Sequence, residues 1–199
     1  MMANILMKHI LPGLCLVVLA TNSSSDQQAT SVTQTQTEAA QMAIMELAGA
    51  LQKELKASMQ AGGPVAAIGL CNTRAIPITQ EVATDHGLSL RRVSLKNRNP
   101  ANRPNDWQVA VLKGFEQQKS TGKDIGTLAW SETVSIDGER EFRFMKAIPT
   151  QAVCLNCHGT DISPEVSEVL AIVYPQDRAT GYIEGDIRGA FVATRRLSN

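Results

Sequence analysis

Cys154, Cys157 and His158 are the residues of this chain whose types and spacing are best suited to chemistry. Two residues separate the cysteines, and the histidine follows the second one directly, which is the C-x-x-C-H pattern of covalent c-type haem attachment. In such a motif the two thiols add to the two vinyl groups of the porphyrin, and the histidine binds the iron. The sequence therefore predicts one haem c, attached through Cys154 and Cys157, with His158 as an axial ligand of the iron.

Two other kinds of site use paired cysteines. A zinc site needs a second pair of cysteine or histidine ligands at matching spacing, and the sequence has none. A redox-active dithiol usually lies where a strand enters a helix in a βαβ unit, and no such pattern precedes Cys154. Haem attachment is therefore the preferred interpretation.

The first twenty residues have the composition of an export signal. Lys8 and His9 precede an apolar run over 10–20, and small residues near Ala20 offer a cleavage site. The run is short for a membrane span, and an uncleaved anchor is the alternative. Export agrees with haem attachment, because c-type haem is joined to protein on the far side of the energy-transducing membrane. We therefore expect a protein of the periplasm or the thylakoid lumen, with no stable membrane insertion after cleavage.

The rest of the chain is expected to hold one domain. Residues 21–36 are rich in Ser, Thr and Gln and are predicted to form a flexible polar tether, which leaves 37–199 as the haem-binding domain. Without residues 1–20 the chain has 18 basic and 19 acidic side chains, a net charge of −1. No basic excess indicates a nucleic-acid partner, and no block of charge indicates a membrane surface.

Helices are predicted in the first part of the domain. A capping-box pattern, Thr35-Gln36-Thr37-Glu38, precedes an apolar stripe at helical spacing, and Gly62-Gly63-Pro64 ends that stripe. The further helices are expected over 65–72, with Cys71 near its end, over 78–86, and from an N-cap at Asp106 to Gly122.

Strands are predicted mainly in the second part. The expected strands cover 88–95, 125–136, 141–147 and 182–193. Asp137-Gly138 joins two of them and is a strong signal for a hairpin. Arg91-Arg92 interrupts the alternation of the first strand. Helices followed by a hairpin-rich sheet predict an α+β fold rather than an all-helical cytochrome.

The second axial ligand of the iron has to come from elsewhere in the chain. The candidates are Cys71, His86, Met42, Met45, Met59 and Met145. Methionine is the usual ligand in electron carriers, whereas a thiolate lowers the reduction potential. Met42 and Met59 fall on or near the apolar stripe, where packing is the simpler role, and His86 lies at a polar helix end. Cys71 has no disulfide partner in an oxidising compartment, which favours it as a ligand; a small, buried and inert side chain is the alternative.

Five segments of the chain resemble motifs that are typical of a known family. They are Cys71-Asn72-Thr73-Arg74-Ala75, Arg98-Asn99-Pro100-Ala101-Asn102-Arg103-Pro104, Cys154-Leu155-Asn156-Cys157-His158-Gly159, Tyr174-Pro175-Gln176-Asp177-Arg178-Ala179 and Gly181-Tyr182. The family is that of exported c-type haem domains once catalogued as a domain of unknown function. Its known cyanobacterial member was found in association with photosystem II. The similarity runs from about residue 38 to 194.

This resemblance implies a PAS-like antiparallel sheet packed with N-terminal and flanking helices around one covalent haem. It implies His158 and Cys71 as the two axial ligands of the iron, with Cys154 and Cys157 as the thioether attachments. On charge alone, four arginines are candidate partners of the haem propionates: Arg74, Arg91, Arg98 and Arg143. Bracing of surface loops is the alternative role for each of them.

An iron with histidine and cysteine ligands in a PAS-like domain points to a sensor of redox change or of a small diatomic gas. Loss of the weaker Fe–S bond would free a site for the gas and release Cys71, which lies between two predicted helices. The chain holds no output module, so a redox or signalling protein would have to read the change. A low-potential electron carrier is the alternative. An enzyme is not expected, because His86 is the only histidine left for acid–base chemistry.

Overall fold

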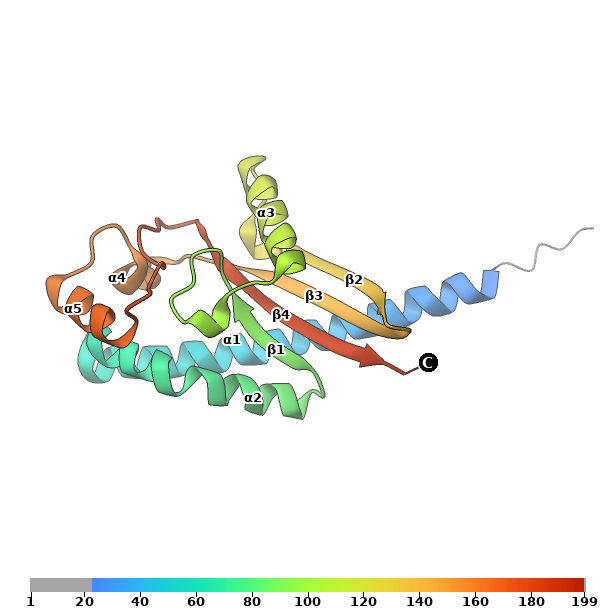
Figure 1. Ribbon diagram of the computed structural model, residues 1–199, viewed down its shortest axis with the longest axis horizontal. Coiled ribbons are helices and arrows are strands. Elements are labelled where there is room, and N and C mark those ends of the chain that lie inside the picture. Colours follow the sequence, from blue (N-terminus) through green and yellow to red (C-terminus); the bar gives the residue numbers. More distant parts are fainter. Residues whose placement is uncertain (1–22, 199) are drawn as a thin grey trace, which may run out of the picture.

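A four-stranded antiparallel sheet forms the centre of the molecule (Figure 1). The structure is a computed structural model, which describes residues 23–198 and the side chains of 33–198. The strands are β1 (Ser89–Val93), β2 (Ala129–Ile136), β3 (Glu139–Pro149) and β4 (Ile187–Leu197). They lie in the order β1-β4-β3-β2, so the last strand pairs with the first. The predicted α+β class with one antiparallel sheet is confirmed.

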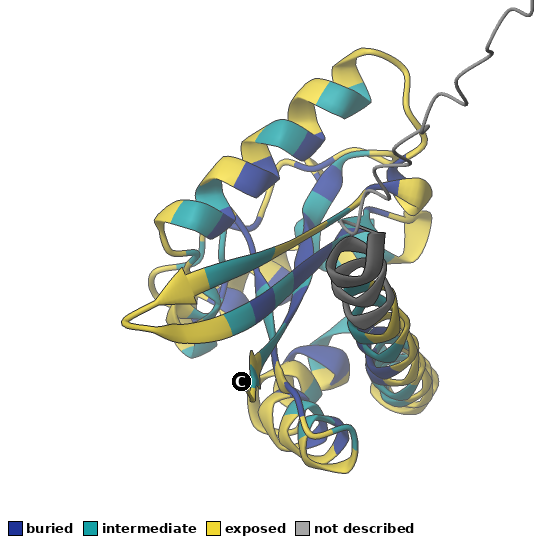
Figure 2. Cartoon of the chain, turned by 90° about the vertical axis from the view of Figure 1, so that its right-hand side faces the viewer, coloured by how far each residue is buried: buried dark blue, intermediate teal, exposed yellow. Residues whose placement is uncertain are grey.

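Helices cover both faces of this sheet. α1 (Ser23–Thr73) and α2 (Ala75–Asp85) lie on one face, and α3 (Asp106–Ser120) lies on the other (Figure 2). α4 (Leu155–His158) and α5 (Pro164–Val173) lie at one end of the sheet and contact α1 (Figure 1). Three 3-10 helices complete the connections: η1 (Pro100–Asn102), η2 (Ile125–Thr127) and η3 (Ala152–Cys154).

Strand alternation sends neighbouring side chains of β3 into two separate cores. Phe142 and Phe144 pack against α1 and α2, whereas Met145 packs against α3. All three side chains are at most 1% exposed. Burial of a large apolar side chain contributes about 1.5–3 kcal/mol, so these contacts hold the helices on both faces of the sheet.

α1 begins earlier than its capping-box pattern predicts. The segment 23–36, predicted as part of a flexible tether, is helical, and the helix begins at Ser23 rather than near Thr35. No glycine or proline occurs between Ser23 and Gly49, so no residue in this polar segment strongly opposes helix extension towards the N-terminus.

The predicted break in this helix is present at Gly62 and Gly63. Both residues have non-helical backbone, with a φ of 67° at Gly63, a conformation that glycine adopts without steric cost. The helix resumes at Pro64 and carries Cys71 near its end. Cys71 therefore lies on a short helical segment of its own.

Local capping moves two element boundaries from their predicted positions. Asn105, not Asp106, is the N-cap of α3, because its side chain accepts a hydrogen bond from the backbone of Gln108 at 3.2 Å. The Gln108 side chain accepts one from the backbone of Asn105 in return. β2 begins at Ala129 rather than at residue 125, because the Asp124 side chain caps a 3-10 turn there.

The hairpin predicted at Asp137-Gly138 joins β2 to β3. The two residues have φ of 52° and 81°, as a type I′ turn requires. The predicted export signal over 1–20 lies outside the described residues. Within the part of the chain that the structure describes, no helix is both long enough and apolar enough to cross a membrane.

Candidate functional site

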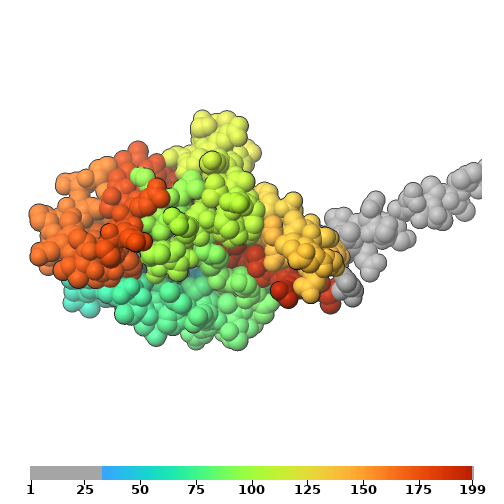
Figure 3. Space-filling view, viewed as in Figure 1, coloured from blue at the N-terminus to red at the C-terminus, as the bar shows by residue number. Residues whose placement is uncertain are grey.

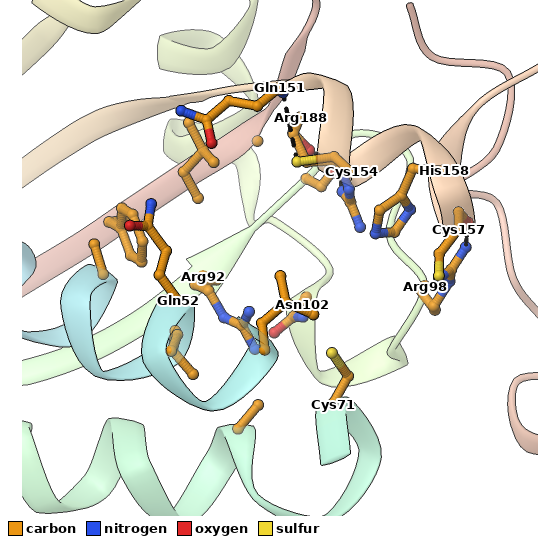
Figure 4. A pocket seen from close by; sticks show the side chains of 18 of the residues that line it. Gln52, Cys71, Arg92, Arg98, Asn102, Gln151, Cys154, Cys157, His158 and Arg188 are labelled. Carbon is orange, nitrogen blue, oxygen red and sulfur yellow. Dashed lines mark hydrogen bonds between the residues drawn. The ribbon is translucent and has the colours of Figure 1, made fainter. Parts of the chain in front are cut away.

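A pocket of about 420 Å³ opens between α1, the sheet and α4. Its lining brings together the four residues that the sequence predicts as a site: Cys71, Cys154, Cys157 and His158. Cys71 comes from the end of α1, and the other three come from η3 and α4 (Figure 4). In the space-filling view, the orange segment that contains η3 and α4 lies directly against the teal end of α1 (Figure 3). The fold thus joins two motifs that are far apart in the sequence.

A single helical turn presents the C-x-x-C-H motif to the pocket. α4 spans only Leu155–His158, and Cys154 precedes it in η3. The backbone N–H of Gly159 donates to the Leu155 carbonyl at 2.9 Å and ends the turn. A Cβ atom at Gly159 would lie 2.6 Å from that oxygen, so the tight exit from the turn requires glycine.

The carbonyl of Ala179 fixes the ring of His158. His158 Nδ1 lies 2.6 Å from this oxygen. Because a carbonyl only accepts hydrogen bonds, Nδ1 carries the proton and Nε2 keeps its lone pair. The backbone N–H of Tyr182 donates to the His158 carbonyl at 2.9 Å and holds the same turn. The remaining lone pair is therefore available to a metal ion.

Burial and nearby positive charge keep His158 neutral. Burial has the largest effect, the guanidinium groups of Arg188 and Arg98 add to it, and the pKa of His158 is lowered from 6.5 to about 2. The hydrogen bond to Ala179 acts in the opposite direction. The imidazole is therefore neutral at physiological pH, which is the form that binds metals.

We expect the metal-free chain to lose stability as the pH falls from 7 to 5. The unfolded chain takes up a proton at His158 below an ordinary pKa of about 6.5, whereas the folded chain does not do so until the pH reaches about 2. The unfolded state binds more protons in this interval, so the free energy of unfolding falls by about 2 kcal/mol. Denaturant titrations at the two pH values measure the fall. The same fall in a His158→Gln variant would contradict this assignment.

Arg98 joins the motif to the loop that follows α5. Its Nε donates to Asp177 Oδ2 at 3.0 Å, and the two side chains are only 10% and 12% exposed. Its Nη2 donates to the carbonyls of Cys157 and Ala179. Asp177 in turn accepts a hydrogen bond from the Ala179 backbone at 2.8 Å. One buried ion pair thus positions both the turn that carries Cys157 and the carbonyl that orients His158.

Cys71 lies across the pocket from His158 (Figure 4). Its side chain is exposed because the pocket opens to solvent. The surrounding protein atoms nevertheless desolvate the thiol and raise its pKa above the ordinary value. Arg92, Arg98 and Arg188 oppose this rise, since nearby cations favour the thiolate. The thiol is thus unpaired and protonated, and a metal ion would have to displace the proton in order to bind the sulfur.

The other candidate ligands divide between the pocket and the rest of the molecule. Among the described residues, those outside the pocket are His86, Met42 and Met145. His86 Nε2 lies at hydrogen-bond distance, 2.8 Å, from a carboxylate oxygen of Glu46. Met45 and Met59 line the pocket together with Cys71. Of the candidates for the second axial ligand, Cys71, Met45 and Met59 therefore line the pocket that also contains His158.

Comparison with known proteins places this geometry in a family. A model of the family described as Tll0287-like matches residues 22–195. The chain belongs to the Tll0287-like family. The crystal structure of the cyanobacterial heme-protein Tll0287 is similar to it, with a TM-score of 0.55 and 24% sequence identity over 88% of this chain and 98% of that chain. No curated protein matches the chain significantly. The family predicted from the five motifs is confirmed, and the structural likeness shows a common fold.

Two arginines of this Tll0287-like chain line the pocket although the sequence does not identify them as site residues. Arg92 extends from β1 and Arg188 from the start of β4 (Figure 4). Burial lowers the pKa of both guanidinium groups. The break that Arg91-Arg92 makes in the alternation of β1 is a sequence signal for the first of them, because Arg92 shares the inward face of the strand with Leu90.

Of the four arginines that charge alone suggests as propionate partners, three are bound to other protein groups. Only Arg98 lines the pocket, and its guanidinium is already bound to protein groups. Arg91 donates to two carbonyls of the loop over 101–103, at 2.8 and 2.9 Å. Arg143 forms an ion pair within β3 at 2.7 Å, and Arg74 is exposed at the start of α2. Arg91 and Arg98 thus brace loops, Arg143 is paired within a strand, and Arg74 is a surface residue.

The residues present in the pocket fit a haem. Two thiols and one neutral imidazole come from a single turn, as covalent attachment and axial ligation require. The lining along α1 and the adjoining strands is largely apolar and suits a macrocycle: it includes Leu51, Leu55, Met59, Ile148 and Phe191. Among the described residues, no three or more His, Cys, Asp or Glu side chains cluster in a way that could hold a bare metal ion.

Proposed function

We propose that this chain binds one haem c, attached through Cys154 and Cys157, with His158 and Cys71 as the axial ligands of the iron. One observation carries the proposal: a neutral histidine with a free Nε2, its two neighbouring thiols and a distant thiol all line the same pocket. The description of the cyanobacterial relative as a heme-protein supports it. When bound, the haem would supply a redox-active iron that can also take a small ligand.

The proposed role is that of a sensor of redox state or of a diatomic gas. The raised pKa of Cys71 means that a proton competes with a metal for this sulfur. Cys71 lies near the end of α1, and α2 begins at Ala75, so release of the sulfur acts at the junction of two helices. The sheet order with helices on both faces is consistent with a PAS-like domain, which supports sensing by analogy of fold alone. A redox or signalling protein is the proposed partner that reads the change.

Export is part of the same proposal. The pattern of residues 1–20 supports delivery to the periplasm or the thylakoid lumen, where haem is attached to C-x-x-C-H motifs. The balanced charge of the rest of the chain gives no support to a nucleic-acid partner.

A low-potential electron carrier is the second candidate, and the openness of the pocket favours it. Val153, beside the first motif cysteine, is 45% exposed, and Cys71 on the other side of the pocket is also exposed. A cofactor held between them would have an edge close to the protein surface, where a redox partner can dock. The two functions differ in whether Cys71 stays bound in both oxidation states.

We propose no catalytic activity. Acid–base chemistry at an iron site most often uses a histidine or a carboxylate beside the iron. Among the described residues that line the pocket there is no carboxylate, and the one histidine is the proposed ligand His158. His86, which the sequence leaves as the candidate for such chemistry, is paired with Glu46 elsewhere.

The Cys71→Ser variant tests the proposed ligation. We expect the oxidised protein to show the low-temperature EPR and optical signature of low-spin iron with a thiolate ligand, and we expect the variant to lose it. Met59→Leu is the matched control, because this methionine lines the same pocket. A spectrum that changes in Met59→Leu and not in Cys71→Ser would contradict the assignment of Cys71. Rapid CO binding by the reduced protein would favour the sensor, and persistence of the thiolate bond would favour the electron carrier.

A further inference from the structure

The charged side chains of the pocket lining are all basic. Its charged members are Arg92, Arg98, Arg188 and Lys146, and among the described residues it includes no aspartate or glutamate. Arg98 is balanced by Asp177, and the Lys146 ammonium donates to a backbone carbonyl. The two remaining arginines carry charge that no acidic group of the lining offsets.

Arg92 has an unsatisfied guanidinium that faces the pocket. Within the described part of the chain, its side chain makes no hydrogen bond and has no carboxylate at ion-pair distance. It lies on the same face of β1 as Leu90, which belongs to the core. An arginine placed among core positions without a partner is costly unless a ligand supplies an anion.

The guanidinium of Arg188 is also only partly hydrogen-bonded. Its Nε is buried and has no hydrogen-bond partner among the described residues. Its Nη1 donates to Ser94 Oγ at 3.2 Å, and its guanidinium carbon lies 5.3 Å from the centre of the Tyr182 ring. Repulsion from Arg98 and Arg92 adds to the cost of burying it. Part of the hydrogen-bonding capacity of Arg188 is therefore free.

We infer that Arg92 and Arg188 bind the two propionate groups of the haem, an inference that rests on the proposed function. A haem presents an apolar ring with two carboxylates on one edge, and the pocket presents an apolar wall with two uncompensated cations. Arginine forms charge-assisted, often bidentate hydrogen bonds with carboxylates. The two strands that carry these arginines are hydrogen-bonded neighbours, so both side chains enter the pocket from the sheet.

This assignment also orients the haem. Cys154 and Cys157 would hold the vinyl groups on the α4 side. Figure 4 shows Arg92 on the opposite side of the pocket from Cys157, whereas Arg188 lies near Cys154 and His158. Vinyl and propionate groups occupy different edges of the porphyrin, so a propionate at Arg92 would lie on the edge of the ring away from Cys157, and the second propionate would reach Arg188 nearer to His158. The propionates would then lie inside the protein against β1 and β4, and another edge of the ring would face solvent.

Titration of the full chain with two porphyrins tests the inference. In a background of Cys154→Ser and Cys157→Ser, which cannot form thioethers, the protein is prepared without haem and titrated with hemin and with hemin dimethyl ester. We expect Arg92→Gln and Arg188→Gln each to weaken hemin binding about tenfold and to leave ester binding unchanged, since the ester has no carboxylates. Arg196→Gln is the control, because this arginine is on β4 with an 82% exposed side chain.

Each outcome of the titration separates this inference from the proposed function. Unchanged hemin binding in both arginine variants, or equal weakening for hemin and its ester, would overturn the inference and leave haem binding intact. Absence of covalently bound haem from the chain that retains Cys154 and Cys157, produced together with a haem-attachment system, would overturn the proposed function itself. Far-UV circular dichroism and thermal melting of each variant identify any that fail to fold.

A second measurement uses the covalently loaded protein. The resonance Raman bands of propionate bending depend on hydrogen bonding to these groups. We expect these bands to shift in Arg92→Gln and Arg188→Gln and to stay in place in Arg196→Gln. Bands that are identical in all three variants and the parent would overturn the inference independently of any binding constant.

Discussion

The Arg98→Met variant is expected to have a free energy of unfolding about 3 kcal/mol lower than the parent chain. The methionine retains the apolar stem and removes the cation, so Asp177 is left as a buried carboxylate without its ion-pair partner; its side chain is 12% exposed. Two carbonyls, those of Cys157 and Ala179, lose their donor at the same time. Because Ala179 orients the His158 ring, we expect the loss to reach the site as well as the fold.

Denaturant unfolding of the purified variants measures this effect. Arg196→Gln serves as a control for removing a charge, since its ion pair with Glu139 is exposed and is worth little. Adding Asp177→Asn to Arg98→Met should recover part of the lost stability, because no uncompensated charge then remains buried. A double variant as unstable as, or less stable than, Arg98→Met would show that the ion pair is not the source of the stability.

The ion pair between Arg98 and Asp177 explains how two of the family motifs act together in the structure. Arg98 begins one of the quoted segments, and Asp177 and Ala179 belong to another. Their side chains and backbone meet around the turn of α4. The sequence identifies these segments as motifs of the family. It does not show that they contact each other, because the contacts join residues that are far apart in the chain.

The parts of the site that sequence reasoning selects are those whose chemistry is local. Cys154, Cys157 and His158 belong to one short motif, and their spacing alone predicts covalent attachment of a haem. The placement of Cys71 is different, because it depends on the break at Gly62-Gly63 and on contacts between α1 and α4. A lone thiol and a family resemblance single out Cys71, and the fold brings it into the pocket; its role as a ligand stays a prediction.

The parts that sequence reasoning misses depend on tertiary structure. Arg92 and Arg188 are single charged residues, and only the pairing of β1 with β4 brings them to one pocket. The acceptor for His158 is a backbone carbonyl, which has no residue signature at all. The helical segment over 23–36 is missed for another reason: its polar composition resembles a linker, while nothing in it stops a helix.

The His158→Ala variant is expected to remove the nitrogen ligand of the iron while both thioether attachments remain possible. The ring is the only imidazole among the described residues of the pocket, and its neutral Nε2 has no substitute there because Cys71 would occupy the other side. We expect the low-spin signal of the oxidised protein to fall at least tenfold and to give way to a high-spin spectrum. Free imidazole added to the variant should restore the low-spin form, since it fills the space that the side chain has left.

His86→Ala is the matched control for this experiment, because it removes the other described histidine, which is paired with Glu46 outside the pocket. Its optical and EPR spectra should equal those of the parent. Rescue by imidazole separates loss of a ligand from loss of structure when the thiolate signature also returns, because a misfolded chain could give only a low-spin haem with two imidazoles. A low-spin spectrum that persists in His158→Ala would mean that two other side chains bind the iron. Met45 and Met59 would then be the residues to exchange next, since they line the same pocket beside Cys71.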